Sequence, residues 1–206
     1  HLDQYLYTYG PMIACQWESV TETLSLRFSR LVDYGCGQGL AGLLLFDRFG
    51  EKFASALTRV VLIEPSAVAL IRAEAVYRSI APECEILCVK KRFDNLGSAD
   101  LMTDASADTL HIFSNVMDID GWDHFRLFSE MMTEGRHTVL VVSASREFDG
   151  GSPRIRDLKA AVDDPKHHKE LSITAITHSE FCEFDCGYDG KYPAVSWRLE
   201  LEVSGG

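Results

Sequence analysis

Apolar and polar residues are arranged along the chain so that buried strands alternate with helices. Short apolar runs, such as Val60–Ile63 and Thr138–Ser143, are typical of parallel strands that are covered on both faces. Between such runs, apolar residues recur near helical spacing, as in the segment 40–57, where Gly50 is expected to interrupt the helix. This alternation predicts an α/β domain built on a mostly parallel sheet.

The first part of this pattern contains five predicted strands separated by helices. The strands are expected over residues 30–34, 60–63, 84–90, 110–113 and 138–143, and the helices over residues 40–57, 67–79, 123–134 and 153–162. Ser66 and Ser152 are expected to be N-caps, with Pro153 at the first helical position. Gly135 is expected to end the helix that begins at residue 123.

The C-terminal part of the chain has a different pattern. Residues 171–176 and 195–203 have strand composition, and the second segment alternates apolar and polar residues throughout. The connector contains Gly187, Gly190 and Pro193 and shows no helical pattern. An antiparallel β-hairpin is therefore predicted after the five parallel strands.

A glycine-rich segment, Leu31–Gly39, joins the first predicted strand to the helix that follows. The strand ends in Asp33, and glycines then occupy positions 35, 37 and 39. Glycine lacks Cβ, so such a turn can adopt positive φ and a ligand can approach the main chain. This Asp-x-Gly-x-Gly-x-Gly form resembles motif I of the class I methyltransferases that depend on S-adenosylmethionine (SAM).

The same segment also satisfies a dinucleotide-binding pattern. The stretch Gly37–Gly42 has the form G-x-G-x-x-G, and Glu64 follows about 20 residues later. In a dinucleotide site, however, the first glycine directly follows the strand, whereas Gly35 and Cys36 intervene here. Asp33 would also repel a pyrophosphate, while it suits the cationic end of SAM. The predicted C-terminal hairpin likewise favours the methyltransferase layout over a further strand–helix crossover.

The resemblance implies a Rossmann-like sheet of seven strands, mostly parallel with a C-terminal antiparallel β-hairpin and with helices on both faces. It implies SAM as the cofactor and no metal. Glu64 would accept hydrogen bonds from the ribose hydroxyls, Pro65 would flank the adenine, and Phe93 and Asp94 would stack on it and accept from its amino group. The full set of cofactor-binding residues that the resemblance implies is Asp33, Gly35, Cys36, Gly37, Gln38, Gly39, Glu64, Pro65, Phe93, Asp94, Ser114 and Asn115.

The residues that would face the transferred methyl group follow the fourth strand, in the segment 113–118. This segment has neither the Asn/Asp-Pro-Pro-Tyr/Phe signature of amino-directed nucleic-acid methyltransferases nor a Pro-Cys nucleophile. Asn115 could bind the cofactor or orient an acceptor, and Asp118 could act as a general base. Both could equally form hydrogen bonds that cap the loop.

One domain is predicted over residues 1–206, with the Rossmann-like core at 29–206. The N-terminal segment 1–28 is aromatic and polar, with Tyr5, Tyr7, Tyr9 and Trp17. In methyltransferases such a segment often forms a cap over the cofactor or substrate. A helix packed on the edge of the sheet explains the composition equally well.

Composition limits the classes of partner. The net charge is −11, and a nucleic-acid binder usually carries a basic footprint, so direct nucleic-acid binding is disfavoured and left open. No apolar run reaches the roughly 20 residues of a bilayer span, so no membrane association is predicted. The six cysteines do not have the spacing of a small disulfide scaffold, and Cys182 and Cys186 with His178 lack a second zinc-binding pair. Cytoplasmic localisation is expected.

Two functions remain open on the sequence. The first is methyl transfer from SAM to an unidentified acceptor, which could be a small molecule, a protein or an RNA. The second is a catalytically silent, methyltransferase-like subunit that binds cofactor or a protein partner within a larger assembly.

Overall fold

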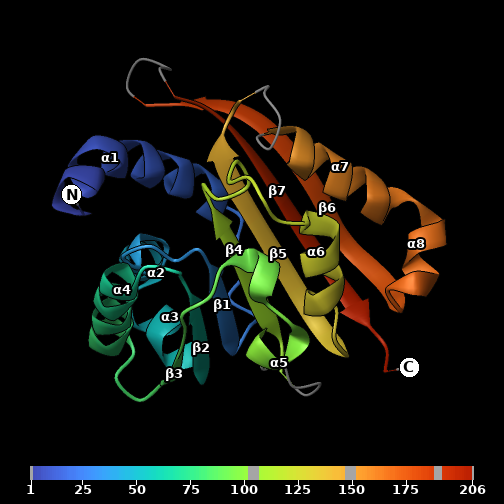
Figure 1. Cartoon of the computed structure of the whole chain (residues 1–206), viewed down its shortest axis with the longest axis horizontal. Helices are drawn as coiled ribbons and strands as arrows, with labels where there is room; N and C mark the ends of the chain where they lie inside the picture. The colour runs from blue at the N-terminus through green and yellow to red at the C-terminus, as the bar shows by residue number, and fades with distance from the viewer. Residues whose placement is uncertain (1, 102–106, 147–151, 188–191, 206) are drawn as a thin grey trace.

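The computed structural model describes residues 2–101, 107–146, 152–187 and 192–205 (Figure 1). The strands are β1 (Arg30–Tyr34), β2 (Arg59–Ile63), β3 (Glu85–Val89), β4 (Thr109–Ser114), β5 (Gly135–Ala144), β6 (Ile173–Cys186) and β7 (Tyr192–Val203). The helices are α1 (Leu2–Thr21), α2 (Leu40–Phe49), α3 (Glu51–Ala56), α4 (Ala67–Ile80), α5 (Ser98–Leu101), α6 (His124–Met131), α7 (Ser152–Asp163) and α8 (Pro165–Glu170). A 3₁₀ turn lies at Phe93–Asn95.

The seven strands form one sheet in the order β3-β2-β1-β4-β5-β7-β6. The five strands from β3 to β5 are parallel, and β7 enters antiparallel between β5 and β6. This arrangement confirms the predicted fold class, including the C-terminal antiparallel hairpin. The order reverses between β1 and β4, which makes the carboxyl ends of these two strands the topological switch point of the sheet.

Helices cover both faces of the sheet, and each face has its own core. One core combines strand residues with side chains of α1, α2, α3 and α4, and the other combines them with side chains of α5, α6 and α7. Successive residues of β1 point to opposite faces of the sheet and so contribute to both cores. Leu31 packs with the first set of helices, and Val32 and Tyr34 pack with the second. Figure 1 shows α1 beside the upper end of the sheet, above α2 and α4.

A chain of polar side chains crosses the core on the side of α6. The Tyr34 hydroxyl lies 3.1 Å from Nδ1 of His111, Nε2 of His111 lies 3.0 Å from Nδ1 of His137, and Nε2 of His137 lies 2.8 Å from the Thr133 carbonyl oxygen. The carbonyl can only accept, so Nε2 of His137 donates to it. Both rings are then neutral, with each hydrogen bond running in the same direction from the Tyr34 hydroxyl to the Thr133 carbonyl.

Most predicted elements lie within a few residues of their expected positions. The short helix α5 and the 3₁₀ turn before it were not predicted, and three further elements differ. Gly135 does not end α6, which stops at Met131; it is the first residue of β5, because β5 pairs with β7 back to that position. Strand β6 continues to Cys186, well into the predicted connector, since it follows β7 past two register shifts. Helix α8 was not predicted; Asp164 caps it through its side chain and Pro165 stands in its first turn.

The N-terminal segment is a single long helix, α1, which contains Pro11. Its buried residues Ile13 and Trp17 join the core on the side of α2, and Thr23 just beyond it accepts a hydrogen bond from Arg198 of β7 at 2.8 Å through its carbonyl. Among the residues that the structure describes, none of the helices combines the length and the hydrophobicity that a bilayer span requires.

Candidate functional site

The candidate site lies at the carboxyl edge of the parallel strands, around the switch point between β1 and β4. Three loops meet there: the glycine turn 35–39 after β1, Glu64 after β2, and the segment 114–118 after β4. Backbone hydrogen bonds tie these loops to neighbouring strands, since Cys36 N–H donates to the Ile63 carbonyl at 3.0 Å and Asn115 N–H donates to the Val142 carbonyl at 2.8 Å.

The glycines of the turn adopt positive φ but have different surroundings. A Cβ on Gly39 (φ +82) would lie 3.0 Å from the Ala73 Cα, so this glycine allows the turn to pack on α4. A Cβ on Gly37 (φ +52) would meet nothing within 4 Å. Packing against the protein therefore does not explain why position 37 lacks a side chain, whereas an approaching ligand would.

Glu64 bridges the glycine turn and the start of α4. Its Oε2 accepts from the Gly37 N–H at 3.3 Å, and its Oε1 accepts from the Ser66 N–H at 2.9 Å. The adjacent Pro65 is exposed. The two backbone hydrogen bonds fix the orientation of the carboxylate, and the side chain remains partly exposed to solvent. A carboxylate in this state can accept hydrogen bonds from the hydroxyl groups of a ligand.

Asp33 lies on the opposite side of the turn from this open edge. Its carboxyl is 1% exposed, faces α4, and accepts a hydrogen bond from the Tyr77 hydroxyl at 3.1 Å. Burial raises the pKa of Asp33 to about 7, the Tyr77 hydrogen bond opposes this rise, and the Glu64 charge adds to it. The structure thus places the Asp33 carboxyl in the core, where it joins the end of β1 to α4.

Two further residues of the turn are buried. The Cys36 thiol is 7% exposed, and burial is the main reason that its pKa is raised well above the usual value. The Gln38 side chain accepts from Arg72 Nη1 at 2.8 Å, and the same nitrogen donates to Asp3 at 2.7 Å. Arg72 of α4 therefore links the glycine turn to the first turn of α1.

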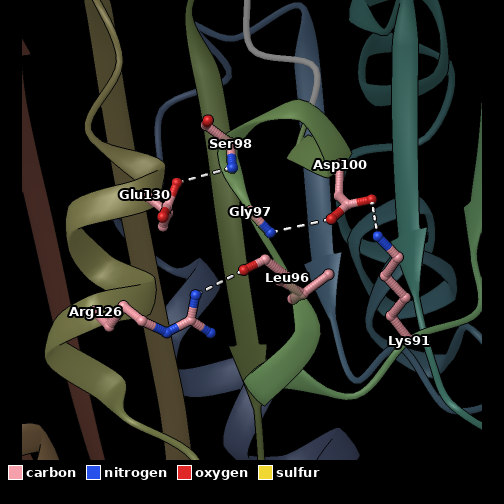
Figure 2. A network of polar contacts seen from close by, with 7 residues as sticks. All are labelled: Lys91, Leu96, Gly97, Ser98, Asp100, Arg126 and Glu130. Atoms are coloured by element: carbon pink, nitrogen blue, oxygen red, sulfur yellow. Dashed lines mark hydrogen bonds and ion pairs between the residues drawn. The ribbon is translucent and has the colours of Figure 1, made fainter.

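The loop after β3 is fixed from outside by α6. Arg126 donates to the carbonyl oxygens of Phe93 at 3.0 Å, Asp94 at 3.0 Å and Leu96 at 2.8 Å. Figure 2 shows α6 meeting the rest of this loop, where Glu130 accepts from the Ser98 N–H at 2.9 Å. The loop is held through its backbone, which leaves its side chains to be set by packing.

That packing separates the two residues expected near an adenine. The Phe93 side chain is 6% exposed and lies edge-on to Trp122, with ring centroids 4.7 Å apart. A Cβ at Gly35 would lie 3.2 Å from its ring, so Phe93 packs directly under the glycine turn. Asp94, by contrast, is exposed at the surface of the loop.

Helix α1 contacts the residues after β4. Trp17 Nε1 donates to the Ser114 hydroxyl at 3.0 Å, and Asn115 Nδ2 donates to Gln16 Oε1 at 2.8 Å. Asn115 has φ +54, and its Oδ1 accepts from the Ala144 N–H at 3.0 Å, so its side chain also fixes the end of β5. Both expected residues of this segment are thus engaged with the protein.

Asp118, the candidate base, forms an ion pair with Arg146, at 2.5 Å between Oδ2 and Nη1. Tyr5 of α1 lies near this carboxylate. The pKa of the Tyr5 hydroxyl is raised, first by burial and then by the charges of Tyr9, Asp118 and Glu64. The Tyr5 hydroxyl therefore lies within electrostatic range of two carboxylates, Glu64 after β2 and Asp118 after β4.

A second concave region shares Trp17 with this edge and is otherwise lined by other parts of the chain. A cleft of about 890 Å³ lies between α1, α2 and the β6–β7 hairpin, with Cys15, Glu18, Arg48 and Tyr192 among its lining residues. Within the described ranges, no three or more metal-ligating side chains converge, and Cys182 and Cys186 are free thiols on β6. The loop contacts at the carboxyl edge, rather than the volume of this cleft, define the candidate site.

Sequence reasoning missed several residues that build this edge. Gln16, Tyr77 and Arg126 each contact a residue of the expected set, at separations of 99, 44 and 33 residues along the chain. No local pattern marks them, because each belongs to a helix that reaches the site only through tertiary packing.

No protein-family model and no curated protein matches the sequence. Solved structures do match. A SAM-dependent methyltransferase from Aquifex aeolicus has a TM-score of 0.57 at 12% identity, over 98% of this chain and 98% of that one. The mitomycin 7-O-methyltransferase MmcR has a TM-score of 0.56 at 17% identity, over 98% of this chain and 57% of that one. The methyltransferase domain of bacterial CtHen1-CN has a TM-score of 0.55 at 15% identity, over 92% of this chain and 100% of that one. At these identities the likeness concerns the fold, and this chain has the fold of the SAM-dependent methyltransferases.

Proposed function

We propose that the chain binds SAM at the glycine turn and transfers its methyl group to an acceptor that is not yet identified. The observation that carries this proposal is the pairing of Gly37 with Glu64 at the switch point. Gly37 leaves space within 4 Å where a side chain would lie, and the Glu64 carboxylate faces its N–H at 3.3 Å. The strand order matches the fold of proteins that are named as SAM-dependent.

The residues present fit such a cofactor. When bound, SAM supplies an activated methyl group, because its sulfonium leaves as a neutral thioether. The Glu64 carboxylate is suited to accept from two ribose hydroxyls, and the open backbone at Gly37 admits close approach of the amino-acid part. We infer that Asp33, which is buried and accepts from Tyr77, supports the site from the core side and does not contact the cofactor.

Positioning is the main task that remains for the protein, since the donor is already activated. We infer that α1 performs part of it by covering the site. Asp3 is tied to Arg72 and through it to Gln38, and Trp17 is tied to Ser114. The Asp118 carboxylate, which pairs with Arg146 through Oδ2, would accept a proton from a hydroxyl or amine acceptor.

Isothermal titration calorimetry tests the proposal directly. SAM and its product S-adenosylhomocysteine should bind with micromolar dissociation constants, and NAD should give no heat of binding. Binding of NAD without binding of SAM would contradict the proposal. Transfer of a radiolabelled methyl group should then be measured with small-molecule, protein and RNA acceptors; SAM binding without transfer to any class would favour the silent subunit.

A further inference from the structure

A buried amide of α1 has a hydrogen-bond donor without a partner. Gln16 is 0% exposed, and within the described part of the chain its Nε2 finds no acceptor. A buried donor left unpaired costs about 1–3 kcal/mol, so native proteins rarely keep one without a reason. The atom lies next to the residues that follow β4, at the switch point of the sheet.

The identity of the unpaired atom follows from its neighbours. The Ala144 N–H can only donate, so the atom of Asn115 that faces it at 3.0 Å is the oxygen. The Asn115 nitrogen therefore faces Gln16 at 2.8 Å, and the Gln16 atom that receives it is the oxygen. Rotating the Gln16 amide would place two donors against each other, so Nε2 must be the group without a partner.

Neither acceptor at the end of β4 forms a hydrogen bond with Gln16 Nε2, and each receives a hydrogen bond from another group. The Ser114 hydroxyl accepts from Trp17 Nε1 at 3.0 Å, and Asn115 Oδ1 accepts from Ala144. A partner for Gln16 would then be supplied by a molecule that enters the site, and it must be a hydrogen-bond acceptor.

Charge and position select the group on that molecule. The inference rests on the proposed function, in which Glu64 takes the ribose at the β2 side of the edge. The other end of SAM, its amino-acid part, then extends toward β4, where Gln16 meets Asn115. The carboxylate is the anionic group of that part, and it requires donors.

We propose that Gln16 binds the carboxylate of the amino-acid part of SAM through Nε2. Because the side chain is fully covered in the free protein, α1 must shift outward as the ligand enters and then close on it. Gln16 would thus be a ligand-binding residue contributed by α1, the helix that covers the site. Its hydrogen bond would favour ligands that carry a carboxylate over ligands that lack one.

The test compares SAM with decarboxylated SAM, which keeps the sulfonium and the ammonium but lacks the carboxylate. The variant Gln16→Met has a similar volume and no donor. Its affinity for SAM should fall about 10- to 100-fold, the range for a lost hydrogen bond to a charged group, and its affinity for decarboxylated SAM should stay within about two-fold of wild type. Gln16→Glu, which opposes two carboxylates, should weaken SAM binding further.

A matched control is Gln4→Met, the same substitution at an exposed position of α1, and it should leave both affinities unchanged. Thermal melting of each variant without ligand measures any loss of stability separately. An equal loss for both ligands in Gln16→Met would assign Gln16 a structural role and overturn the proposal, and so would an unchanged affinity for SAM. If wild-type protein binds neither ligand, the proposed function itself fails.

Discussion

At the scale of single residues, two glycines of one turn have the same backbone conformation and different neighbours. Alanine at Gly39 would place its Cβ 3.0 Å from the Ala73 Cα, while alanine at Gly37 would meet nothing within 4 Å. The positive φ favours glycine at both positions, packing on α4 adds a second reason at position 39, and we propose that ligand approach adds one at position 37.

These surroundings predict that Gly39→Ala mainly lowers stability, whereas Gly37→Ala mainly lowers SAM affinity. Gly39→Ala should lower the free energy of unfolding by about 2–3 kcal/mol, because backbone strain and the contact with α4 add. Gly37→Ala should cost about 1 kcal/mol from its left-handed backbone alone, and should weaken SAM binding at least about 10-fold. Chemical denaturation and calorimetry on both variants check this. Normal SAM binding by Gly37→Ala would remove the turn from the cofactor site.

A second residue prediction concerns Glu64. Glu64→Ala removes the acceptors of the ribose, so SAM affinity should fall roughly 10- to 150-fold, and Glu64→Gln should lose less because one acceptor oxygen remains. The melting temperature without ligand should drop slightly, since the Gly37 and Ser66 N–H groups lose a partner. Calorimetry and thermal melting of the same preparations measure both quantities.

Glu74→Ala provides the control for this change, because Glu74 pairs with Arg78 on the outer face of α4. It removes the same charge from the protein and should leave SAM affinity unchanged. Glu64 could alternatively be a structural partner of Arg72, but Arg72 donates instead to Asp3 and Gln38. A large loss of stability with intact SAM binding would nevertheless exclude Glu64 from the site.

The residues of the site differ in how far the sequence could reveal them. The glycine turn and Glu64 stand at the ends of apolar strands, so their place at one edge of a parallel sheet follows from the pattern. Their proposed roles remain to be tested. Gln16 could not be found in this way, because its partner Asn115 is 99 residues distant and nothing local specifies the packing of α1.

At the scale of elements, β1, β4 and β5 are joined by the polar chain from Tyr34 through His111 and His137. Burial lowers the pKa of both histidines, and for His111 the neighbouring His137 lowers it further. The unfolded chain, with histidine pKa values near 6.5, therefore binds more protons than the folded chain below that pH. The stability that the two neutral rings contribute is present above pH 6.5 and is lost as the pH falls.

The double variant His111→Gln/His137→Gln tests this. Glutamine can donate and accept in the same directions but does not titrate, so the acid-induced loss of about 1.4 kcal/mol per pH unit for each ring should disappear. Urea denaturation between pH 5 and pH 8 gives the slopes. The raised pKa of Asp33 has the opposite effect, because it stabilises the fold at low pH. Asp33 is present in both proteins, so the test compares the difference in free energy of unfolding between variant and wild type. The same pH dependence of the free energy of unfolding in variant and wild type would contradict the proposal that both histidine rings are neutral in the folded protein.

Sequence patterns predicted the buried strands well and predicted less well the elements whose bounds depend on tertiary contacts. The inner parallel strands β1, β2, β4 and β5 were predicted within a few residues because both of their faces are buried and their apolar runs are continuous. The C-terminal end of β6 was not predicted, since the outer part of this strand is half-exposed and its length is set by pairing with β7. For α1 the sequence left a cap and a packed helix open, and the described helix packs on the core while its first turn contacts Arg72.

At the scale of the whole molecule, a mostly parallel sheet with a C-terminal antiparallel hairpin and helices on both faces could be predicted, because apolar strands alternate with helices and the last segments have strand patterns. The order of the strands was not predicted. The confirmed hairpin also separates this fold from a dinucleotide-binding half. The methyl acceptor could not be predicted, since the segment after β4 carries no subfamily signature and its polar groups bind other parts of the protein.

The docking of α1 has a consequence for the order in which the protein forms during synthesis. Helix α1 leaves the ribosome before the other elements that the structure describes, yet the segment that follows it is held by Arg198 of β7, the most C-terminal of the described strands. At roughly 5–20 residues per second, the N-terminal helix must wait on the order of ten seconds or more for that partner. Its apolar face is available to chaperones during this interval. The edge of the sheet that we assign to the cofactor is then completed only when both ends of the described chain have met.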